Sequence, residues 1–199
     1  MTFIKMCGLR DEATVDRAVQ LGVDAVGFVF ARSPRQVTPE VAAQLRQRVP
    51  EGILAVGVFT GIGIADIVSA ATTSGIDVVQ VHDLRSADEV TALHDAGLRV
   101  VRAVNTGGVG DPSASFGEDL LLVDGAVAGA GVTWDWQDRS LLPGGRWILA
   151  GGLDPLNVAQ ALDASGAWGV DVSSGIESSR GVKDQELMAA FVTAVRRRG

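Results

Sequence analysis

The sequence predicts one (β/α)8 barrel of the TIM-barrel class, formed by residues 1–199 as a single domain with short loops. Eight continuous apolar runs alternate with helix-patterned segments, as expected for parallel strands covered on both faces. The repeat length of about 25 residues is that of a compact strand–helix unit. A doubly wound open sheet suits the alternation equally well, but eight units with nothing left over favour the closed barrel.

Apolar runs place the strands at 2–6, 24–30, 53–59, 76–81, 98–104, 119–123, 147–150 and 168–172. Four of the intervening helices end in a glycine directly before the next strand. Glycine suits the left-handed residue just past a helix end, so these positions mark helix-to-strand turns. They are Gly22, Gly75, Gly97 and Gly166.

Capping residues place the helices of the first half. Asp11, Thr38 and Ser86 stand where a side-chain cap would begin a helix, and Glu89 completes a capping box with Ser86. A further helix is expected at 64–74. In the helix after Thr38, the buried stripe is expected to be Val41, Leu45 and Val49.

The second half has weaker helical signals. The connection after residue 104 is polar with little helix in it, and 135–142 is a short helix at best. Asp154 with Pro155 is expected to open a helix that ends at Gly166, and the last helix is expected to start near Lys183.

Two small-residue turns follow the last two expected strands. The first is Gly151-Gly152-Leu153, and the second is Ser173-Ser174-Gly175. Backbone amides in such turns, followed by a helix N-terminus, attract anions. Because barrels of this kind often bind phosphate after strands seven and eight, the pair predicts a phosphate-binding cradle.

Composition excludes several classes of partner. The net charge of −7 disfavours nucleic acid and anionic membrane surfaces, and no apolar run approaches membrane-spanning length. The start of the chain lacks the apolar core of a signal peptide. A single cysteine excludes an internal disulfide and fits a reducing compartment, so a cytoplasmic location is expected.

Polar residues at the expected strand ends form a candidate site, because barrel chemistry takes place at this end of the strands. Cys7 follows strand one, Arg35 strand two, His82 strand four and Asp124 strand six. Each also has a plain structural interpretation: a buried thiol, a surface charge, a satisfied histidine and a turn residue. Position at a strand end makes the functional interpretation of Cys7 and Asp124 about as strong as the structural one.

Two cations are expected inside the barrel wall. Lys5, if buried, needs a carboxylate partner, and Asp171 on the adjacent last strand is the natural candidate. Arg102 has the same need, and the sequence does not indicate its partner.

Several segments, in the right order and over nearly the whole chain, resemble the phosphoribosylanthranilate isomerase family of tryptophan biosynthesis. They are Lys5-Met6-Cys7-Gly8, Gly27-Phe28-Val29-Phe30 with Ser33-Pro34-Arg35, Leu122-Val123-Asp124, Leu149-Ala150-Gly151-Gly152-Leu153, and Asp171-Val172-Ser173-Ser174-Gly175-Ile176-Glu177. The first and last of these are specific to that family among phosphate-binding barrels.

This resemblance implies an aldose–ketose isomerase with Cys7 as general base and Asp124 as general acid. It implies further that Arg35 holds the anthranilate carboxylate, and that the two turns hold the phosphate through Gly151, Gly152, Leu153, Ser174 and Gly175. His82 and Asp171 are the remaining expected substrate contacts. The substrate would be a phosphorylated ribosyl-arylamine, with no metal, cofactor, nucleic acid or membrane involved. The chain would act as a monomer or homodimer.

The chemistry suits these residue types. An Amadori rearrangement needs an acid near the ring oxygen and a base near the C2 hydrogen, which one carboxyl and one thiolate supply. The acid must stay protonated near neutral pH, which requires burial of Asp124, and Lys5 is expected to help Cys7 ionise.

Other assignments remain open at this stage. One is a different phosphosugar barrel, either an indole-glycerol-phosphate synthase type or a histidine-pathway isomerase. Another is a non-catalytic phosphosugar-binding module. Departures from the family pattern are His82-Asp83, Thr60-Gly61, and the segment 129–136, which lacks the usual lysine.

Overall fold

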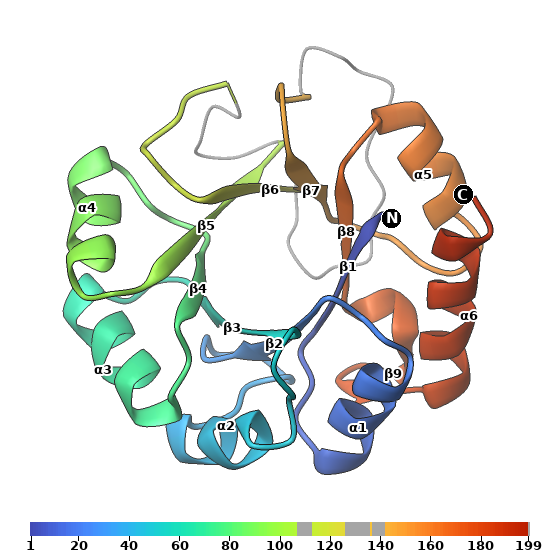
Figure 1. The fold of residues 1–199 in the computed structure, drawn as a ribbon, viewed down its shortest axis with the longest axis horizontal. Coiled ribbons are helices and arrows are strands. Elements are labelled where there is room, and N and C mark those ends of the chain that lie inside the picture. Colours follow the sequence, from blue (N-terminus) through green and yellow to red (C-terminus); the bar gives the residue numbers. More distant parts are fainter. Residues whose placement is uncertain (107–112, 126–135, 137–141, 199) are drawn as a thin grey trace.

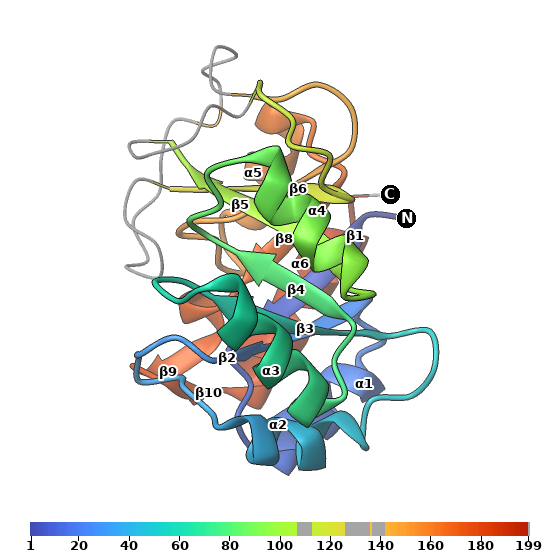
Figure 2. The same cartoon turned by 90° about the vertical axis from the view of Figure 1, so that its left-hand side faces the viewer.

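The structure, a computed structural model, describes residues 1–106, 113–125, 136 and 142–198. Eight parallel strands pair in chain order, and β8 pairs back with β1 to close a barrel. Figure 1 shows the strand ring with helices around its outside, and Figure 2 shows the same arrangement from the side. The predicted (β/α)8 barrel is therefore confirmed.

In the described residues strands and helices alternate up to β5 and again from β7 onward, and a small hairpin follows β8. They are β1 (Phe3–Cys7), α1 (Glu12–Gln20), β2 (Ala25–Val29), α2 (Pro39–Arg46), β3 (Leu54–Phe59), α3 (Ile64–Ser74), β4 (Val78–Val81), α4 (Ala87–Asp95), β5 (Arg99–Asn105), β6 (Leu120–Asp124), β7 (Trp147–Leu149), α5 (Val158–Ser165), β8 (Gly169–Val172), the 3-10 turn η2 (Ser174–Ile176), β9 (Glu177–Ser179), β10 (Val182–Lys183) and α6 (Gln185–Arg196).

Helix boundaries in the first half match the capping signals. The side chains of Asp11, Thr38 and Ser86 each accept a hydrogen bond from a backbone N–H in the first turn of α1, α2 and α4. The four predicted glycines have positive φ values: 65° for Gly22, 66° for Gly75, 79° for Gly97 and 66° for Gly166. The turn residues thus determine where the helices stop.

The predicted stripe of α2 is wrong at its first position. Val41 is 37% exposed, whereas Ala42 and Leu45 are buried. Positions 41, 45 and 49 are each four apart, and such a row drifts around a helix with 3.6 residues per turn. Moreover α2 ends at Arg46, so Val49 is buried as part of the following turn and not as part of the helix.

Two helices begin later than expected. Asp154 caps a turn, accepting from the backbone N–H of Leu156 and Asn157, and α5 begins only at Val158. Before the last helix the chain forms the β9–β10 hairpin, and α6 begins at Gln185 after its cap Asp184. The short helix expected at 135–142 lies almost wholly outside the described residues.

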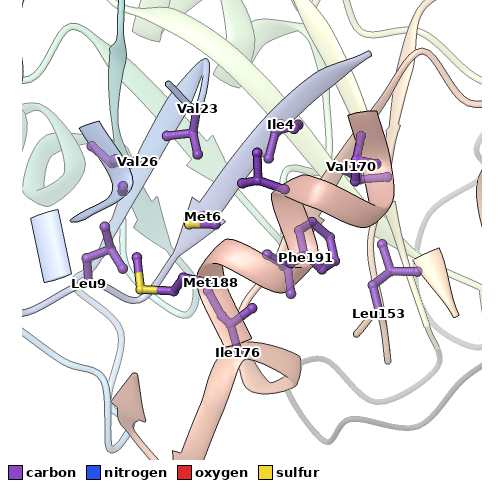
Figure 3. Packing of buried hydrophobic residues seen from close by; sticks show 14 of the residues in the cluster. Ile4, Met6, Leu9, Val23, Val26, Leu153, Val170, Ile176, Met188 and Phe191 are labelled. Atoms are coloured by element: carbon purple, nitrogen blue, oxygen red, sulfur yellow. The ribbon is translucent and has the colours of Figure 1, made fainter. Parts of the chain in front are cut away.

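Helix α6 anchors the first and last strands. Its Met188 and Phe191 are fully buried, and Figure 3 shows Met188 beside Met6 of β1 and Phe191 nearer Ile4 of β1 and Val170 of β8. Burial of one such side chain contributes on the order of 2–3 kcal/mol. The helix therefore stabilises the seam at which the barrel closes. Within the described part of the chain, no helix is long and apolar enough to span a membrane.

The barrel buries both apolar and polar side chains. Along each strand the side chains point alternately to the inside and the outside of the barrel. An apolar cluster fills part of the interior. Its buried members are Ala25, Val56, Val78, Val101, Ala103, Leu122, Ile148 and Ala150. Buried polar side chains, including Lys5, Gln80 and Asp171, are also present on the strands, and Lys5 and Asp171 contact each other. These polar side chains belong to the candidate site.

Candidate active site

Cys7 ends β1 and is buried, with 6% of its surface exposed. On the neighbouring strand, Gly27 leaves room for the thiol, because a Cβ there would lie 2.9 Å from Cys7 Sγ. Burial raises the pKa of the Cys7 thiol and outweighs the charge of Lys5, which acts in the opposite direction. Lys5 thus favours ionisation of the Cys7 thiol, as expected, but the pKa of the thiol is raised overall.

Asp124 ends β6 and is 7% exposed. Burial and the nearby Asp171 carboxylate raise the pKa of Asp124 to about 6, against one opposing hydrogen bond from the Gly125 N–H at 2.8 Å. Gly151 lets the next strand's loop approach closely, since a Cβ there would be 2.8 Å from Asp124 Oδ1. The carboxyl group therefore keeps its proton far above the usual range of an aspartic acid.

The predicted ion pair between Lys5 and Asp171 is confirmed. Lys5 Nζ donates to Asp171 Oδ1 at 2.9 Å across the β1–β8 seam. Burial alone would lower the pKa of Lys5, but Asp171 and Cys7 together outweigh burial and hold that pKa above its ordinary value. Asp171 therefore enters the site as part of a pair.

Arg35 is buried in the loop after β2, where the sequence also allowed a surface charge. Its Nε and Nη2 donate to the two carboxylate oxygens of Glu177, at 2.6 and 2.9 Å. Gly8 makes room for the arginine stem, because a Cβ there would lie 2.7 Å from Arg35 Cδ. Two of the three guanidinium nitrogens thus face a protein carboxylate that sequence reasoning did not connect with Arg35.

Lys183 also reaches Glu177. Its Nζ donates to Glu177 Oε1 at 2.8 Å, to the Ser173 carbonyl at 2.9 Å and to Ser173 Oγ at 3.2 Å. Ser173 Oγ in turn donates to the Cys7 carbonyl at 3.1 Å. From the sequence, Glu177 was known only as the end of a family segment and Lys183 only as the expected start of the last helix. The signal that could have singled them out was two opposite charges flanking a turn.

The two predicted phosphate turns lie side by side. A Cβ at Gly175 would be 1.9 Å from the Leu153 carbonyl oxygen, so only glycine allows this approach. A small pocket opens between the turns, with Asp124 and Asp171 on its wall. Its other lining residues are Ala150, Gly151, Gly152, Leu153, Ser173 and Ser174. The structure thus brings the cradle together with the acid candidate.

Gln80 of β4 and His82, which directly follows that strand, lie on the same face of it. Gln80 Nε2 and His82 Nε2 are 3.0 Å apart. Burial and the charge of Lys5 lower the pKa of His82 to about 4, so the imidazole is neutral at physiological pH.

The structure gives Arg102 partners that the sequence did not indicate. Its Nε donates to Glu118 at 2.7 Å, another nitrogen bonds to the Ala114 carbonyl, and the guanidinium lies 4.8 Å from the Phe116 ring centre. These contacts come from the connection between β5 and β6, away from the pocket. In the described ranges no group of three or more His, Cys, Asp or Glu side chains could hold a metal ion.

Comparison with known proteins agrees with this geometry. A family model described as N-(5'phosphoribosyl)anthranilate (PRA) isomerase matches residues 4–194. N-(5'-phosphoribosyl)anthranilate isomerases from Rhodospirillum rubrum and Beijerinckia indica are 43% and 40% identical, covering 98% of this chain and 98% and 94% of those proteins.

Solved structures agree as well. The crystal structure of TrpF from Jonesia denitrificans has a TM-score of 0.90 at 43% identity, covering 100% of this chain and 98% of that one. A phosphoribosyl anthranilate isomerase in complex with reduced 1-(o-carboxyphenylamino)-1-deoxyribulose 5-phosphate has a TM-score of 0.81 at 28% identity, covering 99% and 100%. Fold, site geometry and relatives lead to one conclusion: the chain belongs to the N-(5'-phosphoribosyl)anthranilate isomerase family.

Proposed function

We propose that this chain, acting as one barrel domain, converts N-(5'-phosphoribosyl)anthranilate to 1-(2-carboxyphenylamino)-1-deoxyribulose 5-phosphate, with Asp124 as general acid and Cys7 as general base. The activity follows from family membership. The observation that supports the division of roles is the buried Asp124 carboxyl, with a pKa of about 6, on the wall of the pocket between the two phosphate turns.

Asp124 acts first in this mechanism. It gives its proton to the ribose ring oxygen, the C1–O4 bond breaks, and the nitrogen lone pair forms a C1=N iminium. A carboxyl group with a pKa of about 6 is a better donor at neutral pH than one with an ordinary pKa, because far more of it is protonated.

Cys7 acts second. Its thiolate takes the C2 proton, the electrons of that C–H bond form C1=C2, and the C1=N pair returns to the nitrogen. The resulting enolamine tautomerises to the ketone. The raised pKa of the thiol has two effects. It lowers the thiolate fraction, and it makes each thiolate a stronger base. The positive iminium and Lys5 both stabilise the thiolate while substrate is bound.

Binding groups surround this pair. Arg35 offers the substrate carboxylate the N–H groups that Glu177 does not use. The backbone amides of Gly152, Leu153, Ser174 and Gly175 take the phosphate, and Asp171 and neutral His82 complete the wall facing the sugar. We place the enzyme in the cytoplasm, since a thiol base works only while it stays reduced.

The oligomeric state is proposed as monomer or homodimer. Among the related structures is one of monomers generated from the dimeric enzyme of Thermotoga maritima, so both forms occur in that protein.

Turnover of freshly prepared phosphoribosylanthranilate, followed by loss of its fluorescence, tests the activity. Asp124→Asn and Cys7→Ser should each slow turnover by ~10²–10⁴-fold while the reduced product analogue still binds. Alkylation of Cys7 should abolish activity, and bound analogue should protect it. Turnover of both variants within a few-fold of the parent, with intact fold, would show the assignment to be wrong.

The phosphate turns need a separate test. Gly152 has a φ of 67°, so any side chain there strains the backbone, and this strain could not be separated from the effect of an added charge. Ser174→Asp, with Ser174→Ala as its matched control, places a negative charge beside the phosphate without that strain. The Asp variant should bind inorganic phosphate and product analogue much more weakly than the Ala variant. Equal binding would place the phosphate elsewhere.

A further inference from the structure

The β9–β10 hairpin carries a buried ion cluster beside the proposed base. Arg35, Glu177 and Lys183 have side chains 9%, 4% and 1% exposed, respectively. Two cations and one anion leave a net charge of +1 in a site that must accept a carboxylate and favour a thiolate. Buried charges are costly unless paired, so their presence here requires a reason.

Lys183 and Glu177 use all of their hydrogen-bonding positions within this cluster, whereas Arg35 does not. The three N–H groups of Lys183 have three acceptors: Glu177 Oε1, the Ser173 carbonyl and Ser173 Oγ. The four acceptor positions of Glu177 have four donors: Arg35 Nε and Nη2, Lys183 Nζ and the Gly181 N–H at 3.0 Å. Lys183 and Glu177 are therefore saturated, while Arg35 keeps three N–H groups.

The cluster also holds both sides of the site mechanically. Gly181, at the hairpin turn, lies against the residue before Arg35, since a Cβ there would be 3.0 Å from the Pro34 carbonyl oxygen. At the other end, Lys183 holds Ser173, whose hydroxyl donates to the carbonyl of Cys7. One hydrogen-bonded path thus joins Arg35, Glu177, Lys183, Ser173 and Cys7.

The lysine content supports a dedicated role. The whole chain has only two lysines, Lys5 and Lys183, and its other cations are arginines. Both lysines are buried and interact with Cys7. A compact ammonium with three donors fits three converging acceptors, which a planar guanidinium does not.

We propose that Glu177 and Lys183 are positioning residues: the hairpin fixes the Arg35 fork for the substrate carboxylate and, through Ser173, holds Cys7 in register with it. This rests on the proposed function. Neither residue touches substrate, because neither has a donor or acceptor left. Their effect is to couple recognition of the anthranilate carboxylate to the location of the base.

Glu177→Gln tests the link to Arg35. The probes are reduced 1-(2-carboxyphenylamino)-1-deoxyribulose 5-phosphate and the corresponding phenylamino compound without the carboxyl group. The variant should bind the first about tenfold or more weakly and the second within about twofold of the parent, because only the first needs the aligned fork. Equal loss with both probes would mean a purely structural role, and no loss with either would overturn the proposal.

Lys183→Met tests the link to Cys7. The charged groups facing Cys7 are Lys5 on its own strand, Asp171 on β8, Lys183 on β10 and Arg35 on the loop after β2. Removing the Lys183 cation should move the pH inflection of Cys7 alkylation by iodoacetamide upward by about one unit. An unmoved inflection would refute the coupling to the base.

A charge-balanced variant guards against misfolding. Glu177→Gln with Lys183→Met removes one charge of each sign, so the cluster keeps its net charge of +1. It should show the same loss of discrimination between the two probes as Glu177→Gln, and parental discrimination would overturn the proposal. Failure of the proposed function is separable, since the parent would then fail to turn over phosphoribosylanthranilate or to distinguish the two probes.

Discussion

Replacing Asp124 by asparagine should stabilise the folded chain at neutral pH. The folded carboxyl keeps its proton up to about pH 6, whereas the unfolded chain releases it near the ordinary value of 3.8. Between these values the folded state binds more protons, so its stability falls as pH rises through this window. Asparagine does not ionise and can still accept from the Gly125 N–H. The asparagine variant therefore does not lose folding stability as the pH rises through this window.

The size of the gain follows from the two pKa values. A difference of about two units corresponds to about 3 kcal/mol at ~1.4 kcal/mol per unit. Urea unfolding of parent and variant should show a difference of only about 0.5 kcal/mol near pH 4 and a gain of up to about 3 kcal/mol above pH 7. Such a gain at the expense of activity is expected where a site holds a group in an unfavourable environment.

Asp119→Asn is the matched control with the opposite sign. Although burial acts against it, hydrogen bonds from the Val100 N–H at 2.7 Å and from His94 lower the pKa of Asp119. Its folded carboxylate favours stability above the unfolded pKa, so the asparagine variant should lose stability at neutral pH. An Asp124→Asn variant that is less stable than the parent at pH 7, or equally changed at pH 4, would refute the reasoning.

Three further predictions follow from the described contacts. The imidazole of His82 should titrate near pH 4 by NMR, so the activity profile above pH 5 should contain no inflection from it; an inflection assigned to His82 near pH 6.5 would contradict its burial. Gly175→Ala should weaken phosphate binding at least tenfold, because its Cβ would displace the Leu153 carbonyl; unchanged phosphate titration would show that the two turns move independently. Lys5→Met should cost ~3–5 kcal/mol of unfolding free energy by leaving Asp171 buried and unpaired, and adding Asp171→Asn should restore much of it; additive losses would mean that the pair is not coupled.

Most of the scaffold could be predicted because its signals are local. Asp11, Thr38 and Ser86 cap helices through contacts within a few residues, and the four turn glycines need only a positive φ. Closure of the barrel followed from counting units. The Lys5–Asp171 pair was predictable because both residues lie on strands that any closed barrel must place together.

What the sequence could not show depends on contacts between distant loops. Arg35 and Glu177 are 142 positions apart and meet only because the hairpin after β8 folds back over the loop after β2. The upward direction of the Cys7 pKa shift could not be predicted for a related reason. Lys5 was visible in the sequence, but the degree of burial that outweighs it depends on all the strands around the thiol. The stripe of α2 was predicted wrongly at Val41 because a row of positions four apart drifts around the helix, and the facing partner, which sequence does not show, decides which side is buried.

The seam between β1 and β8 has a consequence for biosynthesis. Lys5 is made 166 residues before Asp171, so during translation its ammonium lacks this partner until β8 has been made. Pairings this distant in sequence form late. A ribosome-bound chain with seven strands would already contain the thiol, the guanidinium and the acid, yet it would present an open edge to chaperones and proteases. Activity thus requires that β8 has been made and has paired with β1, and two separately expressed fragments should become active only when their strand edges pair.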